Sequence, residues 1–436
     1  MQKLNRTHIS SIPHKEGEIV LFQGSVETIR EKGTISFLIL RDITGTCQGI
    51  TYKGLDSFEI ARKLTKESII SAECRVKLTQ QTKEGFELEM LTLRVLSAAD
   101  PHLPIPVVEK GQMEVGPEAK QNYRFLAWRR PKEAVVLKAL SALDEGYRSF
   151  LSDKGFFEIH TPKLMATPSE SHGELFKVDY FGKKAYLAQS PQLFKQMAIS
   201  AGLERVFEIA PAFRAEMSLT TRHATEFISH DAEMGYIESF EDVLNTVEEM
   251  IKSIMNNIQK RCGADMEKYW NISDIQIKEP IPRLTMAEAK AILRERGLAS
   301  LDLDLNTAEE KAIGDYVKEK YNHDFVFITE FPVEKRPFYH KYSGHGTTIS
   351  ADLIYRGVEI ITTAQREENY DIVLKQAVDK KLNPEAIQWY LDSFKYGCPP
   401  HGGWGFGGAR FIKQLFNLQH IRDAVFLYRG PNRIAP

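Results

Sequence analysis

Two spacings of apolar residues divide the chain. Between residues 17 and 97, apolar and polar residues alternate in short runs, with turn signals such as Thr44-Gly45 between them. Alternation with a period of two predicts half-buried strands. So many short strands in one stretch are typical of an OB-type barrel, a fold often used for single-stranded nucleic acid. The predicted strands are Ile19–Ile29, Gly33–Arg41, Gln48–Tyr52, Ile69–Leu78 and Phe86–Leu96.

Beyond the first hundred residues the apolar spacing becomes helical. From Lys132 to Lys154, apolar residues recur every three or four positions, which predicts a long amphipathic helix. Residues 239–262 and 286–320 predict further helices, to which the sequence assigns no chemical role. Prolines stiffen the stretch before residue 106. The predicted organisation is a barrel domain at 1–105, a linker or hinge at 106–131 and a larger domain at 132–436 with a helical insertion around 239–320.

Composition narrows the class of protein. The chain has 436 residues, of which 42% are hydrophobic, and a net charge of −2. No run of apolar residues is long enough to span a bilayer, and the N-terminus lacks an apolar signal region. Near-neutral charge means that any nucleic-acid surface is a local basic patch. The four cysteines are Cys47, Cys74, Cys262 and Cys398, and they form no CxxC pair. This spacing favours reduced thiols and argues against a structural zinc site.

A glycine-rich segment near the C-terminus suggests a ligand site. From Pro399 to Phe411, five glycines alternate with bulky residues and are followed by Arg410. Glycines let a backbone approach a flat ligand closely, and an Arg can bind phosphate or stack on a base. Ile412–Leu418 predicts an apolar helix after it. The alternative is a structural hairpin that leads into a core helix.

A second segment centred on an Arg points the same way. The spacing predicts a strand that carries Arg214 and Glu216 on one face, a polar loop, and a returning strand with Glu226 and Phe227. An Arg pairs with phosphate, a Glu accepts from an exocyclic amine, and a Phe covers a base, so this pattern predicts a nucleotide clamp. A surface hairpin with a salt bridge is the alternative.

With both segments in view, residues 15–436 resemble class II aminoacyl-tRNA synthetases, and most closely the aspartyl-tRNA synthetases of the archaeal and eukaryotic kind. The family's three motifs match Gly155–Pro162, Phe213–Glu233 and Gly403–Phe411. The resemblance implies an α+β fold: an N-terminal OB-fold barrel, and a catalytic domain with a mainly antiparallel sheet of six to seven strands flanked by helices. It also implies a homodimer whose interface the first motif builds.

The resemblance implies a two-step reaction. A carboxylate of L-aspartate attacks the α-phosphate of ATP, which yields aspartyl-adenylate and pyrophosphate; the acyl group then passes to the terminal ribose of tRNA(Asp). Whether tRNA(Asn) is a second acceptor stays open. Such catalysis depends on positioning and charge neutralisation. A cytoplasmic enzyme without a membrane partner is implied.

The family's ATP-binding residues have counterparts here. By resemblance, Arg214 holds the α-phosphate, Glu216 and Phe227 clamp adenine, and Arg410 stacks on the opposite face; Arg214, Glu216 and Arg410 are the implied catalytic residues. Arg222 and His223 are implied at the far phosphates.

A metal site is implied beside the phosphates. Asp352 and Glu359 match the family's magnesium carboxylates, and Thr362 stands where a hydroxyl helps to bind the metal and the amino acid. Hard oxygens suit Mg²⁺. On spacing alone, two exposed acids at strand ends remain the alternative.

The amino-acid pocket is implied at several separate positions. Glu170 accepts from the substrate's ammonium group, Gln192 and Lys195 share one face at helical spacing, and Arg366 forms a bidentate pair with the side-chain carboxylate. Lys195 is expected to add a second cation. Asp231 is the discriminating residue, because asparaginyl enzymes usually carry Glu there. On this charge count, asparagine would leave the cations unneutralised.

Three residues of the barrel are implied at the anticodon. Phe37 and Gln48 match residues that stack on and hydrogen-bond the central base, and Glu87 helps to read the same region. Without the resemblance, a core role for Phe37 is favoured.

Several positions depart from the family pattern. Ala409 replaces an acid, Ile360–Ala364 replaces a Ser- and Gly-rich run in which Thr363 and Ala364 add methyl bulk, and Ser171–Gly173 replaces a Gly pair. Ala351 replaces an aromatic, and Glu27 matches neither usual residue near the third anticodon base. These departures leave the adenylate chemistry untouched, and an asparaginyl enzyme or a paralogue that serves another acceptor remains an alternative. A further alternative is an RNA-binding protein that has lost catalysis, against which the intact ATP and metal positions argue.

Overall fold

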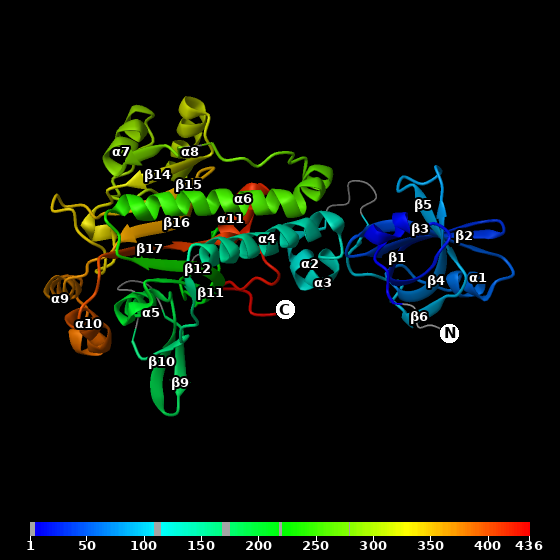
Figure 1. The fold of residues 1–436 in the computed structure, drawn as a ribbon, viewed down its shortest axis with the longest axis horizontal. Coiled ribbons are helices and arrows are strands. Elements are labelled where there is room, and N and C mark those ends of the chain that lie inside the picture. The colour runs from blue at the N-terminus through cyan, green and yellow to red at the C-terminus, as the bar shows by residue number, and fades with distance from the viewer. Residues whose placement is uncertain (1–4, 109–114, 168–174, 218–219, 279) are drawn as a thin grey trace. The chain divides into compact units, whose positions relative to one another are not determined.

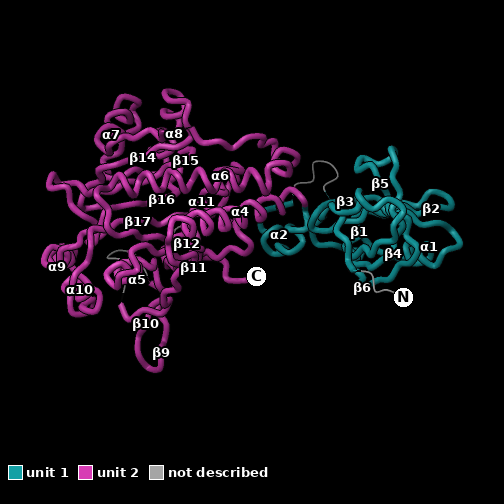
Figure 2. The backbone as a smooth tube through the Cα atoms, viewed as in Figure 1, with its two compact units in different colours: residues 1–130 teal, residues 131–436 magenta. Residues whose placement is uncertain are grey.

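The structure is a computed structural model that describes all residues except 1–4, 109–114, 168–174, 218–219 and 279. The chain forms two compact units, residues 1–130 and residues 131–436 (Figure 2). The first unit includes most of the stretch predicted as a linker, and the domain boundaries drawn from the sequence remain a prediction.

The first unit contains the barrel. Its strands follow the order β1-β2-β3-β5-β4, and β1 also pairs with β4, which closes the barrel. The predicted OB-type barrel is therefore confirmed. The bounds are β1 (Ile19–Lys32), β2 (Ile35–Asp42), β3 (Gly45–Tyr52), β4 (Ile69–Leu78), β5 (Phe86–Met90) and β6 (Arg94–Ser97).

Three details of the first unit differ from the sequence prediction. The strand predicted at Phe86–Leu96 is two strands, β5 and β6, and both pair with β4. Helix α1 (Asp56–Ala61), which has fewer than two turns of periodicity to reveal it, lies between β3 and β4. The predicted linker contains two short helices, α2 (Pro117–Asn122) and α3 (Arg124–Ala127).

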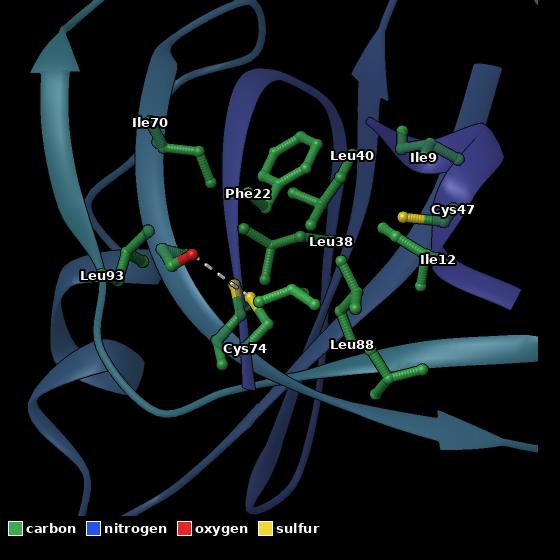
Figure 3. Close-up of a cluster of buried hydrophobic side chains, with 14 of the residues drawn as sticks. Ile9, Ile12, Phe22, Leu38, Leu40, Cys47, Ile70, Cys74, Leu88 and Leu93 are labelled. Carbon is green, nitrogen blue, oxygen red and sulfur yellow. Dashed lines mark hydrogen bonds between the residues drawn. The ribbon is translucent and has the colours of Figure 1, made fainter. Parts of the chain in front are cut away.

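Alternation along the strands builds the core of the barrel. In β2, Leu38 and Leu40 are fully buried, whereas Phe37 and Ile39, which alternate with them, are only partly covered. Figure 3 shows Leu38, Leu40 and Phe22 pointing into one cluster with aliphatic side chains from other strands. The faces of β2 and β3 away from this core therefore point outward, where a ligand can reach them.

The second unit is organised around one large sheet. Its strands follow the order β13-β14-β15-β16-β17-β12-β11-β7, and all neighbours are antiparallel except β13–β14 and β11–β7. The α+β class is confirmed, but the sheet has eight strands because two very short strands at its ends leave little pattern in the sequence. The bounds are β7 (Phe157–Glu158), β11 (Arg205–Phe213), β12 (Glu226–Gly235), β13 (Arg283–Thr285), β14 (Phe325–Thr329), β15 (Ser350–Tyr355), β16 (Val358–Gln365) and β17 (His401–Phe406).

Long helices cover this sheet. Helices α4 (Pro131–Asp153) and α6 (Phe240–Trp270) lie side by side across it (Figure 1). Ser239 and Asp242 form a capping box at the start of α6, which satisfies backbone N–H groups there. The helix expected after the glycine-rich strand starts earlier than predicted: α11 spans Gly408–Leu415, so Arg410 lies in its first turn.

Smaller elements complete the second unit. A three-stranded sheet consists of β8 (Leu164–Met165), β9 (Lys177–Tyr180) and β10 (Lys183–Leu187). The helix predicted at 286–320 is two helices, of which α8 packs on β14, β15 and β16. The remaining helices are α5 (Gln192–Ala198), α7 (Met286–Glu295), α8 (Thr307–Tyr321), α9 (Tyr370–Asp379) and α10 (Gln388–Lys395). Among the described residues, no helix has the length and apolar character needed to cross a membrane.

Candidate active site

A cavity of about 390 Å³ lies in the second unit, lined by residues from β12, β16 and β17 and by the segments beside them. It brings together residues as far apart in the sequence as Gln192 and Arg410. Most of the predicted site residues line it: Gln192, Arg214, Glu216, Arg222, His223, Phe227, Asp231, Glu359, Thr362, Arg366 and Arg410.

The glycines of β17 make room for acids on the neighbouring strand. In the sheet, Gly405 lies between Asp231 of β12 and Thr362 of β16. A Cβ atom at Gly403 would come within 2.4 Å of the Glu233 Oε2 atom, and one at Gly405 would come 3.4 Å from the Asp231 Oδ1 atom. The glycines predicted to admit a ligand therefore also admit two carboxylates.

Four charged side chains form a buried network beneath the cavity. The Arg366 Nε atom donates to Glu233 Oε1 at 2.9 Å, and the Lys195 Nζ atom lies 3.1 Å from Asp231 Oδ1 and 3.3 Å from Glu233 Oε2. Burial by itself would raise the pKa of Glu233, but Arg366 and Lys195 bring it below its ordinary value. Ser229 donates to the other oxygen of Asp231, so this carboxylate is held on both sides.

This network bears on one prediction and corrects another. Lys195 is not among the residues that line the cavity, and its ammonium also donates to the Trp404 carbonyl at 2.9 Å, so it holds Asp231 in place. Its contact with the substrate stays a prediction. The two cations are balanced by Asp231 and Glu233, so the argument that asparagine would leave them unneutralised is wrong. Arg366 still lines the cavity, and Glu233 contacts only its Nε and Nη2 atoms.

Arg214 and Glu216 lie beyond the strand predicted to carry them. Strand β11 ends at Phe213, where the chain turns toward the cavity. Both side chains are exposed and line the cavity, and the Arg214 guanidinium lies 5.5 Å from the centre of the Phe227 ring. This arrangement places a cation and an aromatic face next to each other at the cavity wall.

The remaining cations of the cavity are tied to acids. Arg410 Nη1 lies 3.3 Å from Glu359 Oε2 and donates to the Glu359 carbonyl at 3.2 Å. Arg222 Nη1 donates to Glu310 Oε2 at 2.6 Å. Burial, Arg410 and Arg222 lower the pKa of His223 to about 4, so this ring is uncharged at neutral pH.

The residues predicted to hold a metal lie on two neighbouring strands. Asp352 and Thr362 face each other across β15 and β16, and the Thr362 hydroxyl donates to Glu359 Oε1 at 3.0 Å. Asp352 is buried and Glu359 only partly covered, so the alternative of two exposed acids is wrong. Arg336, which the sequence analysis missed, reaches Asp352 Oδ2 at 2.7 Å.

These residues fit Mg²⁺ in donor type. All three offer hard oxygens, and the buried Asp352 Oδ1 atom has no hydrogen-bond partner within the described part of the chain. Burial raises the pKa of Asp352, whereas Arg410 and the Thr362 hydroxyl outweigh burial at Glu359 and lower its pKa. The described residues contain no cluster of three or more His, Cys, Asp or Glu arranged for a metal, so an ion here would need ligands from ATP or water.

Three residues that the prediction lacked support the site. Glu233 lies two positions after Asp231 on β12 and shares its face, so strand periodicity could have revealed it. Arg336 and Glu310 lie far from the motifs in sequence, and no local pattern marks them.

The positions that depart from the family pattern differ in whether they line the cavity. Ala409 lines the cavity. Thr363 does not: it lies on the other face of β16 from Thr362 and donates to the Gly403 carbonyl at 3.1 Å, so it adds no bulk to the cavity wall. Ala364 is buried and also absent from the lining. Glu170 and Ser171–Gly173 lie outside the described residues.

The barrel carries the second predicted site. Gln48 pairs with Ile39 of β2 and with Glu87 of β5, and Gln48 Nε2 donates to Glu87 Oε2 at 3.0 Å. Phe37, two residues from Ile39, shares the outward face and is partly exposed, so it is not a core aromatic. Glu27 is held by Arg41 Nη1 at 3.2 Å.

This combination of an OB barrel with a mainly antiparallel sheet that carries an arginine-lined cavity is that of a class II aminoacyl-tRNA synthetase. Family comparison agrees: residues 116–429 match the model for class II tRNA synthetases (D, K and N), and residues 20–96 match the OB-fold nucleic acid binding domain. The chain belongs to the class II tRNA synthetase family.

Individual relatives are similar over their whole length. The aspartate–tRNA(Asp/Asn) ligase of Methanopyrus kandleri is 38% identical over 97% of each chain, and the aspartate–tRNA(Asp) ligase of Pyrococcus abyssi is 38% identical over 99% of this chain and 100% of its own. The crystal structure of asparaginyl-tRNA synthetase from Pyrococcus horikoshii with asparaginyl-adenylate superposes with a TM-score of 0.91 at 30% identity, covering 100% of both chains.

Proposed function

We propose that this protein is an aspartate–tRNA ligase. In the first step a carboxylate oxygen of L-aspartate bonds to the α-phosphorus of ATP, and the bond to the bridging oxygen breaks to release pyrophosphate. In the second step the terminal ribose hydroxyl of tRNA attacks the acyl carbon, and AMP leaves. The observation that carries the proposal is the convergence of Arg214, Phe227, Arg366 and Arg410 on one cavity.

Each of these side chains matches one part of the two substrates. Arg214, exposed and beside Phe227, is suited to the α-phosphate, and Phe227 with Arg410 to the two faces of adenine. Glu216 is suited to the adenine amine. Arg366, whose Nη1 atom is not used by Glu233, is suited to the side-chain carboxylate of aspartate. The buried network holds Arg366 in place before the substrate arrives, which lowers the cost of binding.

Magnesium belongs to this proposal together with ATP. Asp352, Glu359 and Thr362 would hold the ion, which supplies neutralisation of phosphate charge when bound. Arg336 and Arg410 neutralise the same carboxylates in the protein alone.

A homodimer in the cytoplasm completes the proposal. Strand β7 is an end strand of the sheet and Phe157 on it is 60% exposed, as expected of a strand that meets a second copy. Sedimentation of the purified protein tests the dimer, because a monomer at micromolar concentration contradicts it.

Pyrophosphate exchange tests the amino-acid substrate. We expect exchange with ATP to depend on aspartate and to be much weaker with asparagine. Faster exchange with asparagine would assign the chain to the asparaginyl enzymes. No exchange with either amino acid would favour the RNA-binding alternative.

Parallel aminoacylation of tRNA(Asp) and tRNA(Asn) tests the acceptor. The Methanopyrus relative is named for both tRNAs and the Pyrococcus relative for one, so both outcomes have a precedent. We expect charging of tRNA(Asp). Adenylate formation without charging of either tRNA would show a paralogue that serves another acceptor.

A further inference from the structure

Helix α8 belongs to the helical insertion for which the sequence suggested no chemistry, yet one of its side chains reaches the cavity wall from behind. Glu310, in the first turn of α8, is 4% exposed. Its Oε2 atom accepts from Arg222 Nη1 at 2.6 Å and from the backbone N–H of Glu359 at 3.0 Å. A single buried oxygen therefore joins the loop after β11 to the start of β16.

Close backbone packing keeps Glu310 at this position. A Cβ atom on Gly314 of α8 would come within 2.6 Å of the Gly357 nitrogen, and one on Gly357 would come within 2.7 Å of the Lys311 Cα atom. Two glycines thus let α8 lie directly on the turn between β15 and β16. Because this contact is between backbones, α8 cannot shift easily relative to Glu359.

This contact holds Arg222 in place and uses only part of its N–H donors. Its side chain lines the cavity, while Glu310 lies outside the lining. Glu310 accepts from Nη1 only, and the buried Arg222 Nε atom has no hydrogen-bond partner among the residues the structure describes. A guanidinium held at one nitrogen by a buried acid can direct its other donors at an anion.

We propose that Glu310 is a positioning residue that fixes Arg222 for the terminal phosphates of ATP. The inference rests on the proposed function for the identity of the ligand, and it assigns the helical insertion a part in nucleotide binding. Glu310 acts through Arg222 and does not touch the nucleotide itself.

Equilibrium binding of ATP without amino acid, measured by calorimetry on the full chain, tests this role. Glu310→Gln keeps the shape of the side chain but removes its charge, and we expect ATP to bind about tenfold more weakly, because a bond between two charged groups is replaced by a weaker one to a neutral amide. Glu319→Gln is the matched control, because it removes the same charge from an exposed position of α8 that pairs with Arg296. We expect it to change ATP binding less than about twofold.

A double-mutant cycle separates positioning from general support of the fold. If Glu310 acts through Arg222, adding Glu310→Gln to Arg222→Gln weakens ATP binding no further. Effects that multiply, or a Glu310→Gln protein that binds ATP like Glu319→Gln, would overturn the inference. Should Glu310→Gln not fold, Glu310→Asp replaces it with the same expectation, because the shorter side chain draws the carboxylate away from Arg222.

The inference and the proposed function can fail separately. Aspartate-dependent exchange by the unaltered protein tests the function, and ATP binding by the variants tests Glu310. Normal exchange together with unaltered ATP binding in Glu310→Gln would reject only the role of Glu310.

Discussion

The cavity of the second unit and the outward face of the barrel differ in how they present polar groups. In the cavity, Arg366 and Arg410 are each paired with an acid before any ligand arrives. On the barrel, one hydrogen-bonded pair, Gln48 and Glu87, lies on the same face as a partly exposed Phe37.

The difference follows from the ligands proposed for each. Phosphates and carboxylates need cations whose positions are fixed in advance, because reorganising charges during a reaction is costly. An unpaired base needs an aromatic face and a few hydrogen-bonding groups, which cost little to leave in water. The comparison predicts that charge changes in the cavity affect catalysis and, where the charge is buried, also folding, whereas changes on the barrel face affect only RNA binding.

The largest effect is expected where the cavity network is most buried. Glu233→Gln leaves Arg366 and Lys195 with one acid between them, and breaking a buried pair costs about 3–5 kcal/mol of the free energy of unfolding. Denaturant unfolding of the second unit measures the loss. Glu226→Gln, at an exposed position of the same strand, is the control and should leave the transition unchanged. Equal stability of the two variants would show that the network does not stabilise the fold.

Removing Arg214 is expected to separate catalysis from folding. The side chain is exposed, so Arg214→Ala should unfold at the same temperature as the unaltered protein. Loss of a donor at developing charge typically lowers the rate by about 10²–10³-fold. Pyrophosphate exchange gives the rate, and exchange at the normal rate would refute the assignment of Arg214 to the α-phosphate.

A smaller effect, on RNA binding alone, is expected from a substitution in the barrel. Phe37→Ala removes a stacking surface worth about 1–3 kcal/mol, so the KM for tRNA should rise about 5- to 150-fold. Exchange without tRNA should not change. Ile43→Ala removes another exposed apolar side chain of the barrel, one that is 73% exposed, and serves as the control. An equal rise of KM in both variants would mean that the barrel binds RNA without using Phe37 specifically.

The smallest effect concerns pH. Because the pKa of His223 is about 4 in the folded protein and near its ordinary value when unfolded, its contribution to stability is full above pH 6.5 and is lost as pH falls toward 4. His223→Gln should therefore lower the unfolding temperature less at pH 5 than at pH 8. Thermal unfolding of both proteins at the two pH values measures this effect. The same decrease in unfolding temperature at both pH values would contradict the lowered pKa of His223.

Much of this picture could be predicted from the sequence because it depends on local pattern. Alternation along Ile35–Tyr52 revealed the barrel, and the motif residues Arg214, Phe227 and Arg410 were assigned to one site that the cavity reproduces. The short elements were missed, since α1 and β7 have too few residues for a period to emerge.

The error in the charge count arose because acids and cations pair with each other in the folded protein. From the sequence, Arg366, Lys195 and Asp231 were counted as charges that face a ligand, but the fold adds Glu233, which pairs with both cations. A count of charges along the chain cannot show which of them neutralise one another.

The strand and helix periods, the glycines of β17 and the presence of the arginines follow from the amino-acid sequence alone, because each depends on residues close together in the chain. The acid that each arginine pairs with depends on how the chain folds: Glu233 pairs with Arg366, Glu310 with Arg222 and Asp352 with Arg336. These partners lie 16 to 133 positions apart. Electrostatic pairing depends on distance in space, and burial decides how strongly each pair acts.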